Sequence, residues 1–178
     1  MPEQLTTSTD NTRGRPWLIG ALPEVGVVLA IFAIGGALAG VVWEWIWTPP
    51  SGVVFRGEWL LDPEQASGDF SATGIYVVVA SIAGLLLGAL CGLVVHRREL
   101  LTLASVIAGA ALAAWLMLRV GQALGPPDPR PLAASAKELS SLPSDLRVVG
   151  KSPLVALPSG ALLGLIVVLF GLSRRSRH

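Results

Sequence analysis

The sequence is short of charge and of cysteine, and both shortages exclude classes of protein. Asp, Glu, Lys and Arg make up 14% of the 178 residues, whereas a soluble domain usually has about 25%. The single cysteine excludes a disulfide framework within the chain. The net charge of +1 gives no overall field that would attract an anionic partner such as a nucleic acid. We therefore predict neither an ordinary soluble domain nor a nucleic-acid binder.

In place of charge, the chain has four long runs without any charged residue, at 25–43, 70–95, 100–118 and 152–173. The shortest runs have 19 residues, and a helix of that length spans about 28 Å, close to the hydrocarbon thickness of a bilayer. Runs that are apolar on all sides favour helices over barrel strands, because hydrocarbon leaves no partner for an open backbone. The predicted fold class is an all-α integral membrane protein with four transmembrane helices.

We expect these helices at about 23–47, 71–95, 99–124 and 153–172, arranged as two antiparallel helical hairpins. The linker between the second and third helices is so short that they should form a tight hairpin. The remaining segments of the chain are a disordered tail at 1–16, outer loops at 48–70 and 125–152, and a basic tail at 174–178, around one membrane domain at 17–173.

The fourth helix contains Pro158, which leaves two forms open. Either the helix begins near Pro153 and kinks at Pro158, or Leu154–Leu157 enter as extended chain packed against protein.

The outer loops carry short β-prone runs. In the first loop, 52–55 and 58–61 flank Arg56-Gly57, which predicts a small hairpin. In the second loop, Leu146–Val149 precede Gly150 and predict a strand. We expect the two loops to form a small cap together.

Lys and Arg residues set the expected orientation. Residues 1–22, 96–99 and 173–178 hold seven Lys and Arg in 32 residues, whereas residues 48–71 and 119–152 on the other side hold six in 58. The positive-inside rule therefore predicts that both termini lie in the cytoplasm. Ala37-Leu38-Ala39 resembles a signal cleavage site, but apolar residues continue beyond it, so we favour an uncleaved first helix.

Three segments carry a family resemblance, namely VVWEWIWTPP at 41–50, FSATGIY at 70–76 and GPPDP at 125–129. They resemble an actinobacterial family of small four-helix membrane proteins that is defined by a domain of unknown function. The resemblance covers most of residues 20–172. It implies a location in the plasma membrane, and it brings no activity, ligand or catalytic residue with it.

Charged and aromatic residues gather near the predicted helix ends. Glu44 and Arg119 are both placed at the outer end of hydrocarbon, where they can form an ion pair that is either a structural clasp or a functional site. Glu24 follows Pro23, and a proline followed by an acidic residue is ordinary at the start of a helix. The alternative interpretation of Glu24 is a proton site on the cytoplasmic side. The tryptophans that we expect to anchor the helices at the membrane interfaces are Trp17, Trp43, Trp45, Trp47 and Trp115.

Glycines recur at a spacing of four residues, which places them on one face of a helix and lets another backbone approach closely. The members of this predicted packing face are Gly36, Gly40, Gly84, Gly88, Gly92, Gly160 and Gly164. The face packs either within the bundle or against a second protein or another copy.

A faint duplication is also present. Pro49-Pro50 and Pro126-Pro127 are 77 positions apart, and each pair precedes a polar loop and a returning helix. This arrangement fits a parallel repeat, although proline also commonly follows any helix end.

No catalytic motif and no metal-ligand set is found, since Cys91, His96 and His178 do not form one, and no cofactor is expected. We predict a non-enzymatic accessory or scaffold subunit of a membrane complex. Its partners would be the lipid bilayer and another membrane protein or another copy of itself. The alternative is a small homo-oligomeric solute or ion transporter, and an intramembrane enzyme ranks third.

Overall fold

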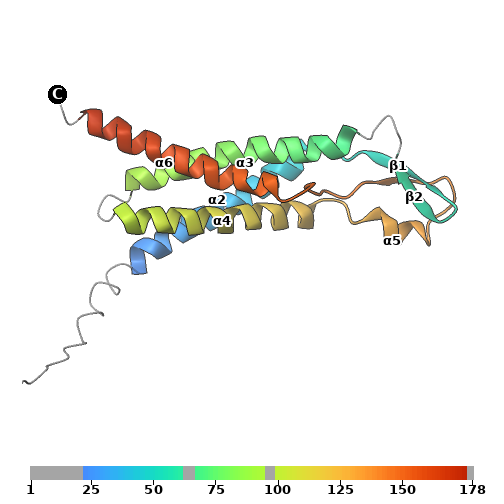
Figure 1. Ribbon diagram of the computed structural model, residues 1–178. Coiled ribbons are helices and arrows are strands. Elements are labelled where there is room, and N and C mark those ends of the chain that lie inside the picture. Colours follow the sequence, from blue (N-terminus) through green and yellow to red (C-terminus); the bar gives the residue numbers. More distant parts are fainter. Residues whose placement is uncertain (1–21, 62–66, 95–98, 176–178) are drawn as a thin grey trace, which may run out of the picture.

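The computed structural model describes residues 22–61, 67–94 and 99–175. Four long helices form an elongated bundle, and the segments between them form a small cap at one end (Figure 1). The first described residues of the bundle and its last helical residues lie at the end away from the cap.

The four long helices are α2 (Leu22–Ile46), α3 (Ser67–Val94), α4 (Glu99–Leu124) and α6 (Ala156–Arg175). Each of them is long and apolar enough to cross a membrane. The four predicted helices are confirmed, with ends that differ from the expected ones by a few residues.

Of the two predicted forms, the extended chain at Leu154–Leu157 is wrong, because the helical segment begins at Ser152, near Pro153 as the other form has it. A 3₁₀ turn, η2 (Ser152–Val155), leads directly into α6, with Pro153 at its beginning. Pro158 is the third residue of α6. In the first turn of a helix the backbone N–H has no partner within the helix, so proline is tolerated there.

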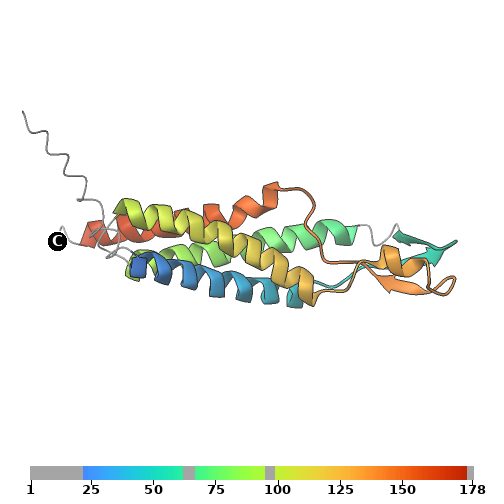
Figure 2. The same cartoon turned by 90° about the horizontal axis from the view of Figure 1, so that it is seen from below.

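The closest packing joins helices that are not consecutive in the chain. α2 packs along α4, and α3 packs along α6, whereas α3 and α4 make few contacts with each other. Figure 2 shows α4 lying along α2. The predicted tight hairpin of the second and third helices is therefore not a close pair, and the two predicted antiparallel hairpins are not the closest pairs either. Both close pairs run parallel. In α2/α4, Gly36 meets Ala113 and Gly40 meets Met117, and in α3/α6, Gly84 meets Leu157 and Gly88 meets Ala161.

Small residues explain this choice of partners. A Cβ atom built on Gly36 would lie 2.5 Å from the carbonyl oxygen of Ala113, so the backbones of α2 and α4 touch where a side chain would not fit. Gly84 and Gly88 in α3 likewise lie directly against the backbone of Ala161 in α6. Between apolar helices in lipid, such close backbone contact is a main source of association.

The spacing of these contacts agrees with the predicted repeat. Gly36 meets Ala113 and Gly84 meets Ala161, and each pair is 77 positions apart, like the two Pro-Pro pairs. In this interpretation α2 corresponds to α4 and α3 to α6. The loops between the helices differ, since one holds a hairpin and the other holds α5 (Pro129–Ala133) and a single strand.

The cap is a three-stranded antiparallel sheet of order β2-β1-β3. β1 (Ser51–Phe55) and β2 (Glu58–Leu61) form the predicted hairpin, which is confirmed. Its turn residues Arg56 and Gly57 have φ values of 53° and 76°, and two positive values are typical of a type I′ turn. The backbone N–H of Arg56 donates to the carboxylate of Glu138 at 2.8 Å, which ties the turn to the second loop.

The strand predicted at Leu146–Val149 is wrong. The strand of the second loop is β3 (Ser141–Pro143), which pairs with β1, and the backbone N–H of Ser144 donates to Pro50 at 2.8 Å. Leu146 is buried and lies beside Gly125 at the end of α4. Its apolar side chain therefore fills the bundle end instead of joining the sheet.

Candidate functional site

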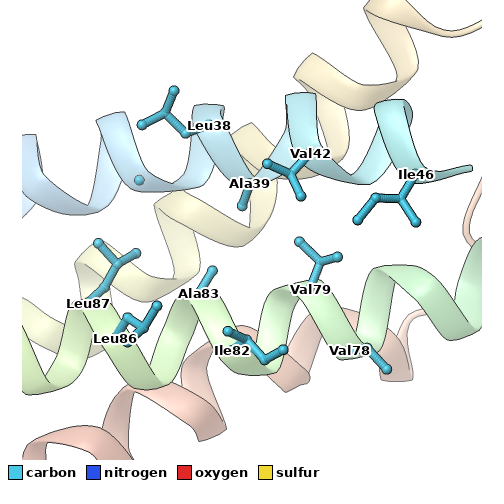
Figure 3. A pocket seen from close by; sticks show the side chains of 11 residues that line it. Leu38, Ala39, Val42, Ile46, Val78, Val79, Ile82, Ala83, Leu86 and Leu87 are labelled. Carbon is cyan, nitrogen blue, oxygen red and sulfur yellow. The ribbon is translucent and has the colours of Figure 1, made fainter.

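A groove between α2 and α3 is one feature of the described surface that could hold another molecule. It has a volume of about 430 Å³. Figure 3 shows Ala39 of α2 and Val79, Ala83 and Leu87 of α3 directed into the space between the two helices. The groove exists because α2 is drawn towards α4 and α3 towards α6, which leaves α2 and α3 in looser contact.

Two rows of large apolar side chains border the α2/α3 groove. The exposed residues Leu38, Val42 and Ile46 form one row along α2 at four-residue spacing. The second row runs along α3 with the same spacing and consists of Val78, Ile82 and Leu86. A groove between two ridges at helical spacing fits the side-chain ridge of a third helix.

The α2/α3 groove offers no polar chemistry. All of its lining residues are Gly, Ala, Val, Leu or Ile. Such a surface cannot hold a metal ion or orient a polar substrate, and it binds only apolar groups through van der Waals contact.

A second cavity, of about 320 Å³, lies between α4 and the η2–α6 segment. It is also apolar, and its lining includes Ala111, Trp115, Leu118 and Leu154. Here a charged group stands beside the apolar wall, because the guanidinium of Arg119 lies over the Trp115 ring, 5.6 Å from its centroid.

The predicted ion pair between Glu44 and Arg119 is not formed among the described side chains. Arg119 is exposed and contacts Trp115, one helical turn earlier, instead of the carboxylate of Glu44. A cation over an indole face gains electrostatic attraction without leaving water, so the local contact competes well with a pair across two helices.

The tryptophans predicted as interface anchors differ in their exposure. Trp45 and Trp115 are 82% and 52% exposed, as interface anchors should be. Trp43 and Trp47 are only 0% and 6% exposed and belong to the core, because they lie on the faces of the α2 end that pack against other elements. Trp17 lies outside the described residues.

The predicted glycine face packs within the bundle, which confirms that alternative. Each glycine of the set lies against residues of a neighbouring long helix, and Gly160 and Gly164 contact α3 in return. These faces are therefore occupied, so a second protein would have to use a different surface.

Glu24 lies in a crevice between α2 and α4 whose lining includes Thr102 and Ser105. Its Oε2 atom is buried without a hydrogen-bond partner. The Ser105 hydroxyl donates to the Leu101 carbonyl at 2.8 Å. The crevice is too small to hold a water molecule, so the described residues do not continue from Glu24 into a proton path.

Within the described ranges, no group of three His, Cys, Asp or Glu residues could hold a metal ion. The two apolar cavities were not predicted from the sequence. They depend on which helices pack together, and the alternation of small and large residues in 35–46 and 78–87 is the only sequence signal for the larger one.

The chain matches no protein-family model, no curated protein and no solved structure. The resemblance to an actinobacterial family therefore stays a prediction.

Proposed function

We propose that this protein is a non-enzymatic accessory subunit of the plasma membrane, and that its α2/α3 groove receives a transmembrane helix of another membrane protein. In this proposal both termini lie in the cytoplasm and the three-stranded cap lies outside. The orientation is supported by the density of Lys and Arg in the sequence.

The observation that carries the proposal is the α2/α3 groove with its two ridges. The small residues Gly35, Ala39 and Ala83 lie between rows of larger apolar side chains. A helix seated there would gain continuous van der Waals contact along several turns, which is how helices associate in lipid. A fluid acyl chain would not match such a regular spacing as well.

A transporter has less support. Among the described helical side chains, the buried polar ones are Thr102 and Ser105. Both lie in the first two turns of α4, beside the narrow crevice at Glu24. A hydrophilic path would need polar groups along the length of the bundle.

The test uses a photo-crosslinking amino acid introduced at Ile82 in the α2/α3 groove, in a C-terminally tagged full-length chain expressed in native membranes. The expected product is an adduct to an apolar segment of one other membrane protein, identified by peptide mass spectrometry. The same crosslinker at Leu163, which is exposed on α6, serves as the control and should not give that adduct.

A second variant keeps the test informative. Ala83→Phe fills the groove and should abolish copurification of the crosslinked protein, whereas Leu163→Phe adds the same ring elsewhere and should not. Adducts only to lipid, or only to another copy of this chain, would overturn the proposal. Copurification that survives Ala83→Phe in a correctly folded variant would overturn it as well.

A further inference from the structure

We propose that the cavity between α4 and the η2–α6 segment binds one anionic phospholipid, with an acyl chain in the cavity and the phosphate at Arg119. This inference shares with the proposed function only the location in a bilayer. It concerns a different face of the molecule and does not depend on any protein partner.

The cavity has the right chemistry for an acyl chain. Its volume is about 320 Å³, and its walls are formed by Ala111, Ala114, Trp115 and Leu118 from α4 together with Leu154, Val155 and Pro158 from the opposite side. The exposed apolar side chains of Trp115 and Val155 extend this surface outwards. A hydrocarbon chain in the cavity would contact protein on two sides instead of other lipids.

Arg119 has the right chemistry for the phosphate. Its guanidinium lies over the Trp115 ring, and Trp115 itself lines the cavity. Within the described part of the chain, the guanidinium forms no ion pair, so its N–H donors remain available in the plane of the group. Arginine presents these donors in a fork that matches a phosphate.

The position of Arg119 along the bundle also fits the binding of a lipid phosphate. It follows directly after the uncharged run 100–118, so it lies where hydrocarbon ends and lipid phosphates begin. A second basic residue, Lys151, is the N-cap of η2 on the other wall of the cavity. The carbonyl of Lys151 accepts the backbone N–H of Leu154 at 3.2 Å. Leu154 lines the cavity, so a second basic residue lies within one turn of it.

The α2/α3 groove provides an internal contrast. It is larger and also apolar, and neither cavity has a charged residue in its lining. At the α4/η2 site, however, Arg119 lies over Trp115, which is itself part of the lining. The pairing of an apolar cavity with a basic group at headgroup depth is found at the α4/η2 site, and this pairing is what selects an anionic lipid over a neutral one.

The test is native mass spectrometry of the delipidated full-length protein, titrated with phosphatidylglycerol or phosphatidylcholine of the same acyl chains. We expect one phosphatidylglycerol to bind about fivefold more tightly than phosphatidylcholine, which is the effect expected of one basic residue near a membrane surface. Arg119→Gln should weaken the binding of phosphatidylglycerol more than that of phosphatidylcholine, because the choline cation already offsets the phosphate charge, and so it should remove the preference. Ala111→Phe should fill the cavity and weaken the binding of both lipids.

Arg130→Gln is the matched control, because Arg130 is an exposed arginine of α5 at the same end of the molecule. It should leave the preference intact. Equal affinities for the two lipids in the unmodified protein would overturn the inference. An equal loss of preference in Arg119→Gln and Arg130→Gln would also overturn it, since it would indicate a diffuse attraction of charge instead of a site.

Discussion

The indole ring of Trp43 and the phenol ring of Tyr76 meet edge to face, with centroids 5.0 Å apart and planes at 79°. Each ring also makes a hydrogen bond to the backbone of a neighbouring helix. The Trp43 indole N–H donates to the carbonyl of Ala72 at 2.9 Å, and the Tyr76 hydroxyl donates to the carbonyl of Ala114 at 3.2 Å. This cluster joins α2, α3 and α4, and so it links the α2/α4 pair to the α3/α6 pair.

The first prediction concerns Trp43. Trp43→Phe should lower the free energy of unfolding by about 2 kcal/mol, because it removes a buried hydrogen bond and leaves unfilled volume in the core. In a chain of this size that loss corresponds to a fall in melting temperature of about 4–8 °C. Thermal unfolding in detergent measures this fall in melting temperature.

Trp45→Phe is the control, since Trp45 is 82% exposed and its replacement should change the melting temperature little. Equal effects of the two changes would contradict the buried position of Trp43.

The second prediction concerns the hydroxyl of Tyr76. Tyr76→Phe keeps the ring against Trp43 and removes only the hydrogen bond to Ala114. Hydrogen bonds between helices in lipid contribute about 0.6 kcal/mol on average, with a maximum near 1.7. We therefore expect a loss of about 1 kcal/mol in the free energy of unfolding, measured by denaturant titration in detergent. A variant that is as stable as the unmodified protein would show that this bond does not hold α3 to α4.

The third prediction uses two glycines of α3 that receive the same change. A Cβ atom on Gly88 would collide with the backbone of Ala161, whereas a Cβ atom on Gly74 would meet nothing within 4 Å. Gly88→Ala should therefore push α6 away and destabilise the protein by about 1–3 kcal/mol. Gly74→Ala should stabilise it by about 0.5–1 kcal/mol, because alanine loses less backbone entropy in a helix.

Thermal unfolding of the two alanine variants side by side gives the sign of each effect. Two changes of the same sign would contradict the close approach of α3 and α6 at Gly88.

The number of helices and their positions could be predicted from the sequence, because charge is absent over stretches of membrane length. The partners of the helices could not be predicted. The spacing of Gly84 and Gly88 indicates a packing face on α3, but Ala161 on α6 is one small residue among many that could fill it. Short linkers favoured consecutive helices as partners, and the close backbone contact of non-consecutive helices outweighed that preference.

The tryptophans illustrate a similar limit. Trp43 and Trp45 are two positions apart, so they point to nearly opposite sides of α2. The sequence does not indicate which of the two faces inwards, because that depends on the position of Gly121 in α4, against which Trp43 lies. The Glu44–Arg119 pair was predicted from depth alone, and depth does not fix the direction of either side chain.

The fourth prediction distinguishes the observed strand of the second loop from the one expected from the sequence. Val53 and Ser141 are direct partners in the β1–β3 ladder, and hydrogen bonds at the neighbouring position, such as Val54 N–H to Ser140 at 3.0 Å, make theirs a non-hydrogen-bonded pair. Cα atoms in such pairs are about 4.5 Å apart, which is within the range of a disulfide. Val53→Cys with Ser141→Cys, in a Cys91→Ser background, should therefore form a disulfide under mild oxidation, detected by a shift in gel mobility after cleavage between the two loops.

Val53→Cys with Val148→Cys is the control, since Val148 lies in the segment that was expected to form the strand but does not join the sheet. A disulfide in the control and none at Ser141 would reverse the assignment of β3.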